Sequence, residues 1–99
     1  MIQIIVLDEF GEQSASFGKF NINDIQTIID KAEKENMSCL AFVDILQDTY
    51  FNDIQCRDIK KEIETLKQYE NLNPELMLTI QKAVNKALVE EEYIKFEGI

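Results

Sequence analysis

The segment Ile2–Leu7 is the feature that most limits what this chain can fold into. Its residues, Ile-Gln-Ile-Ile-Val-Leu, are β-branched or apolar at both alternating sets of positions. A strand on the rim of a sheet usually keeps one polar face, so this pattern is typical of a strand inside a sheet. We therefore expect a sheet built around this segment.

The length of 99 residues fits a single domain, 1–99, because two separate cores would each be small enough to need metals or disulfides. Hydrophobic residues make up 45% of the chain, which predicts a folded domain rather than an acidic disordered tail. The two cysteines, Cys39 and Cys56, lie among apolar neighbours without C-x-x-C spacing. They predict buried, reduced thiols and a cytoplasmic protein. The first residues, Met-Ile-Gln-Ile-Ile-Val-Leu-Asp, contain no basic region and too short an apolar stretch to span a membrane, so we expect no export signal or membrane anchor.

Changes in hydrophobic period divide the rest of the chain into elements. The expected elements, in chain order, are strands over 2–7 and 14–20, a helix from 22 to near 36, strands over 37–44 and 48–51, helices beginning after Asn52 and after Asn73, and a strand over 93–97. Gly18 predicts that the second strand is weak or bulged. The continuous apolar run Met37–Asp44 predicts a buried strand, and Pro74 suits the first position of the third helix.

This order, ββαββααβ, predicts an α+β domain with a mostly antiparallel sheet of four to five strands and three helices. The third helix has the widest apolar stripe and should cover most of the sheet. A right-handed crossover through the first helix would place the strand over 37–44 beside Ile2–Leu7. We expect the strand order 14–20, 2–7, 37–44, 48–51, with 93–97 on an edge because its charged positions discourage further pairing.

The charge balance predicts a basic protein partner. Ten basic residues face 19 acidic ones, which gives a net charge of −9, so nucleic acids and anionic membranes are not expected partners. Residues 1–52 hold nine acids and three bases, with acids and aromatic rings in two turns, while a further acidic run lies at 90–92. Exposed aromatic rings can anchor a partner while neighbouring carboxylates steer it. The candidate partner-binding residues are Asp8, Glu9, Phe10, Glu12, Asp44, Asp48 and Tyr50.

A structural interpretation stands beside this one. Asp44 and Asp48 have the positions of turn and cap residues whose carboxylates bind local backbone N–H groups. Phe51 is expected in the core, and so is Met77 within the apolar stripe of the third helix. The binding hypothesis requires the carboxylates of Asp44 and Asp48 to face a partner, whereas the structural interpretation has them bind local backbone N–H groups.

The sequence offers little for catalysis. It contains no His, the commonest general base and metal ligand, and its three Gly form no phosphate-binding loop. The acids around Asp44 do not have the spacing of an EF-hand loop. We therefore expect no catalytic residue, metal site or cofactor, and an enzyme remains a minor alternative.

One stretch resembles a known kind of protein. Between Asp44 and Gln55 the sequence follows the pattern D-x-x-x-D-T-x-F-N-x-x-Q, carried by Asp44, Asp48, Thr49, Phe51, Asn52 and Gln55. It resembles small acidic bacterial immunity-type proteins of toxin–immunity competition systems, which share a strand ending in Asp, this motif and then a helix. The resemblance implies a protein that binds a cognate toxin domain and blocks its active site or its access to substrate.

Two other functions remain open. A nucleic-acid mimic could inhibit a DNA-binding protein, although lysines such as Lys60 and Lys61 interrupt the acids along the helices. The chain could also be a small structural or oligomerisation subunit, monomeric or homodimeric, that pairs through an exposed last strand.

Overall fold

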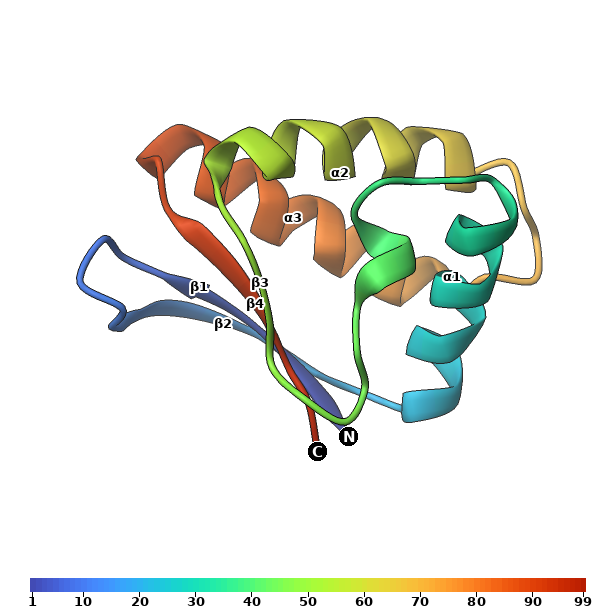
Figure 1. Cartoon of the computed structure of the whole chain (residues 1–99), viewed down its shortest axis with the longest axis horizontal. Helices are drawn as coiled ribbons and strands as arrows, with labels where there is room; N and C mark the ends of the chain where they lie inside the picture. Colours follow the sequence, from blue (N-terminus) through green and yellow to red (C-terminus); the bar gives the residue numbers. More distant parts are fainter.

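The computed structural model describes residues 1–99 as a sheet with helices packed on one of its sides (Figure 1). The elements, in chain order, are β1 (Ile2–Leu7), β2 (Gln13–Phe20), α1 (Ile22–Lys34), the short 3-10 helix η1 (Leu40–Phe42), β3 (Thr49–Phe51), α2 (Asp53–Leu66), α3 (Pro74–Glu90) and β4 (Tyr93–Glu97). The four strands lie in the order β2-β1-β4-β3, and each neighbouring pair is antiparallel. The predicted α+β class, with an antiparallel sheet and three helices, is confirmed. None of the helices combines the length and the apolar character needed to cross a membrane.

The core lies between the sheet and the helices. Ile2, Ile4 and Val6 of β1 are fully buried and belong to the main apolar cluster. α3 contacts β1, β2 and β4, so it covers most of the sheet, as its wide apolar stripe predicted. Phe51 and Phe96 meet edge to face, with ring centroids 5.9 Å apart. The predicted burial of Phe51, Met77 and both cysteines is confirmed.

Side-chain caps fix where the helices begin. The Asn21 side chain accepts a hydrogen bond from the Asn23 backbone N–H at the start of α1. At α2, the side chains of Asn52 and Gln55 each accept from the other's backbone N–H, at 2.8 and 2.9 Å, which forms a capping box. Asn73 caps α3, and Pro74 occupies its first turn. Two of the motif residues that carry the resemblance therefore serve to start a helix.

The predicted strand over 37–44 is wrong. This segment forms a turn and then η1, and it joins no strand. Its backbone finds another acceptor: the carboxylate of Glu62, on α2, accepts from the N–H groups of Cys39 and Leu40 at 3.1 and 2.8 Å. Glu62 is only 7% exposed, although it lies among charged residues in the sequence of α2. Leu40 and Val43 still enter the core, so the apolar run reports burial correctly but not conformation.

The predicted edge position of the last strand is also wrong. β4 lies between β1 and β3, where Ile4 pairs with Phe96 and Thr49 pairs with the same residue from the other side. Alternation of polar and apolar residues shows that one face of a strand is uncovered, but it does not distinguish an edge from a centre. Lys95 and Glu97 are polar because their side chains lie on that uncovered face. β1 thus has neighbours on both sides, as its sequence predicted.

The bulged character predicted for the second strand is confirmed. The pairing of β2 with β1 shifts register at two places, after Ile4 and after Val6. Gly18, which pairs with Ile4, has φ +112°, a conformation that side chains disfavour.

Candidate functional site

The loop between β1 and β2 presents an exposed aromatic ring on a well-defined turn. The carboxylate of Asp8 accepts from the backbone N–H groups of Phe10 and Glu12, at 2.9 and 3.0 Å, and the Asp8 N–H donates back to the Glu12 carbonyl. Gly11 closes the turn with φ +80°. Phe10 is 81% exposed at its tip. The loop therefore holds a large apolar side chain in water, as expected of a binding residue.

A second acidic segment lies beside this loop. β1 ends at Leu7, which pairs with Tyr93 at the start of β4, so the residues before β4 meet the residues after β1. A surface hollow of about 210 Å³ is lined by carboxylates from both segments, and we call these residues the acidic end: Asp8, Glu9, Glu90, Glu91 and Glu92.

One carboxylate of the acidic end holds it in place. Glu92 is 9% exposed and accepts hydrogen bonds from Ser14 Oγ, on β2, at 3.1 Å and from Lys86 Nζ, on α3, at 2.8 Å. The preceding Glu91 has a left-handed backbone with φ 55° and closes α3. Glu92 thereby ties the helix end to the β1–β2 hairpin.

The candidate residues around the turn before β3, Asp44 and Asp48, lie at the other end of the sheet. Asp48 precedes Thr49, which pairs with Phe96 near the end of β4, whereas the Phe10 loop lies beside the beginning of β4 (Figure 1). The chain therefore does not bring Asp44 and Asp48 together with Asp8, Glu9, Phe10 and Glu12. The acidic run Glu90–Glu92, which was not among the predicted partner-binding residues, lies beside the hairpin instead.

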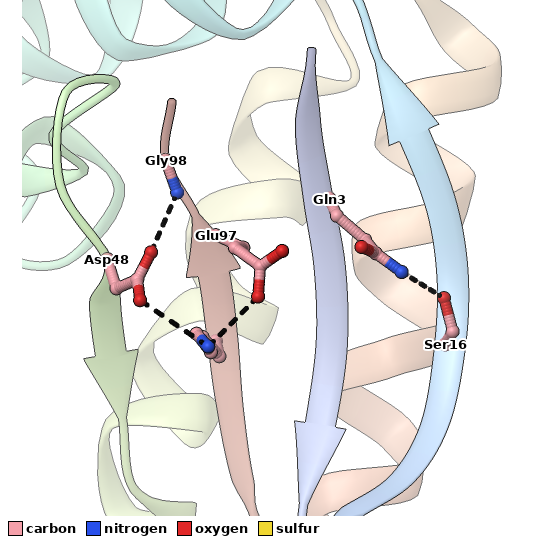
Figure 2. Close-up of polar contacts among 6 residues, drawn as sticks. Gln3, Ser16, Asp48, Glu97 and Gly98 are labelled. Atoms are coloured by element: carbon pink, nitrogen blue, oxygen red, sulfur yellow. Dashed lines mark hydrogen bonds and ion pairs between the residues drawn. The ribbon is translucent and has the colours of Figure 1, made fainter.

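Asp44 and Asp48 perform structural tasks. Asp44 Oδ1 accepts from the Leu46 N–H at 2.9 Å, the local turn bond that the structural interpretation predicted. Asp48 Oδ1 accepts from the Gly98 N–H at 3.0 Å, and its Oδ2 lies 3.4 Å from Lys95 Nζ (Figure 2). These carboxylates stabilise the turn and attach the C-terminal residues to it.

The polar side chains on the uncovered face of the sheet form hydrogen bonds and ion pairs with one another. Lys95 Nζ lies 3.0 Å from Glu97 Oε2 and 5.7 Å from the centre of the Tyr50 ring. Across the sheet, Gln3 Nε2 donates to Ser16 Oγ at 2.9 Å (Figure 2). Tyr50 is 53% exposed, but its ring lies beside a cation that already has two acidic partners. This face is less suited than the acidic end to attract a charged partner.

The Lys95 cluster predicts how stability changes in alkali. The hydrogen bond to Glu97, followed by the charge of Asp48, raises the pKa of Lys95 in the folded state. The folded state therefore holds this proton more tightly than the unfolded state, so the stabilisation is complete below the ordinary lysine pKa, about 10.4, and is lost as pH rises through the raised value. We expect the melting temperature of the wild type to fall more steeply above about pH 10 than that of Lys95→Gln. Equal slopes in thermal melts would contradict this role.

Neither cysteine is activated as a thiolate. Burial raises the pKa of Cys56 to about 12 and also raises the pKa of Cys39, so both thiols stay protonated near neutral pH. No three His, Cys, Asp or Glu side chains are placed to hold a metal ion. The feature that the geometry supports best is a binding surface at the acidic end.

Comparison of the chain with models of protein families, with curated proteins and with solved structures finds no match.

Proposed function

We propose that this protein is an immunity-type inhibitor that binds a basic toxin domain through its acidic end and blocks the toxin's active site or its access to substrate. The observation that carries the proposal is Phe10, which is 81% exposed on a turn fixed by the Asp8 carboxylate. The motif between Asp44 and Gln55 and the net charge of −9 agree with it.

The surroundings of Phe10 suit a basic cleft. Nucleases and similar effectors bind phosphates with clustered cations, which carboxylates at the acidic end could occupy in place of substrate. The aromatic ring would supply the buried contact, and the carboxylates would speed association in a way that weakens with salt. The nucleic-acid-mimic alternative is less favoured because Arg57, Lys60 and Lys61 lie next to the acidic end at Glu91.

The test uses the toxin domain encoded beside the gene of this protein. Co-expression should protect cells, and the purified proteins should form a complex measurable by calorimetry. Phe10→Ala should weaken binding at least about 30-fold, because a central aromatic contact is worth about 2 kcal/mol or more. Phe42→Ala removes another exposed ring, 72% exposed, from a different part of the chain and should leave the affinity unchanged.

A second variant examines the charges separately. Glu9→Lys combined with Glu12→Lys should slow association more than it speeds dissociation, and the difference should shrink as salt rises. Absence of both complex and protection, with a folded protein and an active toxin, would refute the proposed function.

A further inference from the structure

Next to the acidic end lies a surface of opposite charge. A hollow of about 470 Å³ lies between residues 53–61 of α2 and the end of α3. We call it the basic hollow, and its lining residues are Asp53, Arg57, Lys60, Lys61, Leu88 and Glu91. Arg57, Lys60 and Lys61 have i, i+3 and i+4 spacing, which places them on one face of α2. This is a local concentration of cations on a strongly acidic protein.

These cations have no ionic partner within the chain. The four ion pairs of the structure use Lys67, Lys86 and Lys95, so no carboxylate lies within 4 Å of the cationic groups of the basic hollow. Leu88 supplies an apolar part of the wall. The hollow thus offers an apolar contact within a rim where three cations outnumber two carboxylates, Asp53 and Glu91. Its complement is an apolar group flanked by carboxylates.

The chain itself presents that complement. Phe10 projects from its loop beside Glu9 and the other carboxylates of the acidic end, which shares Glu91 with the basic hollow. The β1–β2 loop, the start of α2 and the end of α3 all lie toward the same end of the long axis of the molecule (Figure 1). Two complementary surfaces side by side on one end can pair twice with a second copy related by a two-fold axis.

We propose that two copies of this chain pair end to end, with the Phe10 loop of each copy entering the basic hollow of the other. In each of the two equivalent contacts, the Phe10 ring lies against Leu88 and the cationic groups of α2, where aromatic–cation attraction adds to ion pairing. The pair covers the acidic end. A basic partner therefore competes with the second copy for the same surface.

The size of this end makes the dimer weak. The molecule measures 35 × 26 × 20 Å, so an end-on contact buries on the order of 500 Å² per copy. An interface of that size is typical of transient association, and the net charge of −9 opposes it at long range. We expect a dissociation constant of about 10–1000 μM at about 0.15 M salt, where the Debye length is about 8 Å.

A reciprocal charge exchange tests the pairing with the purified protein alone. Sedimentation equilibrium should show the wild type dimerising at the highest concentrations, whereas Arg57→Glu/Lys61→Glu and Glu9→Lys/Glu90→Lys should each remain monomeric. In each variant both contacts of a homodimer bring like charges together, whereas in the mixture both contacts bring opposite charges together. The mixture should therefore form a heterodimer at least as tight as the wild-type dimer. All four side chains are exposed, so the variants should fold, as circular dichroism would verify.

Phe10→Ala should weaken the dimer at least about 10-fold, whereas Phe42→Ala should not affect it. A wild type that stays monomeric at about 1 mM overturns the proposal. So does a dimer that either charge variant leaves intact, or a mixture of monomeric variants that fails to associate. The experiment requires no toxin, so its failure and the failure of the proposed function are distinguishable.

Discussion

Replacing Glu62 by alanine is expected to lower the free energy of unfolding by about 3 kcal/mol, because two buried backbone donors lose their acceptor. The Glu62 carboxylate accepts from the Cys39 and Leu40 N–H groups, and Ser38 Oγ lies 3.5 Å from it. An alanine side chain reaches none of them, and no strand lies beside this segment to replace the lost bonds. Urea denaturation measures the effect.

A matched substitution two residues along the same helix separates this effect from the general cost of altering α2. The Glu64 side chain is 57% exposed and pairs with Lys67, so Glu64→Ala should change stability by less than about 0.5 kcal/mol. Glu62→Gln, which keeps one carbonyl acceptor, should fall between the two. In Glu62→Ala, Cys39 should also react faster with a thiol reagent. Equal losses in the two alanine variants would show that Glu62 does not hold this segment.

Replacing Phe96 by alanine is expected to cost about 4 kcal/mol, because the ring is 1% exposed and packs edge to face on Phe51. Phe96→Leu should cost less and keeps the variant measurable if alanine leaves the protein largely unfolded. Phe42→Ala, at an exposed position, should change stability by less than about 0.5 kcal/mol. Chemical denaturation compares the three variants.

Amide hydrogen exchange tests the position of β4 independently of packing. A strand between two neighbours has its backbone N–H groups in hydrogen bonds on both sides, so the amides of Ile94, Lys95 and Phe96 should exchange as slowly as those of β1. Exchange as fast as at the start of β2 would place β4 on an edge and contradict the strand order.

Local chemistry made much of the fold predictable. Each helix begins with an asparagine N-cap, and Pro74 follows Asn73 in the first turn of α3. These residues set a helix start through contacts within a few positions of the chain. The position of β1 inside the sheet, with a neighbouring strand on each side, was likewise evident from its own six residues. Such signals depend on neighbouring positions in the chain, which a sequence displays directly.

The failures came from partners far apart in the sequence. The segment 37–44 has the composition of a strand, but Glu62, more than 20 residues away, satisfies its N–H groups. Helical periodicity places Glu62 on the buried face of α2, three residues after Ile59, but it does not show which backbone groups this carboxylate binds. The acidic end was likewise half predicted: its hairpin acids were selected, but the run at 90–92 joins them only because β4 pairs with β1. Strand order therefore decided both the fold and the site.

The irregular edges of the sheet bear on how this protein behaves when concentrated. β3 has only three residues, and β2 is distorted by two register shifts and the left-handed backbone of Gly18. Short or bulged rims offer poor templates for another strand, so the sheet resists growth into aggregates. The protein should accordingly remain in solution at the millimolar concentrations at which weak association becomes measurable.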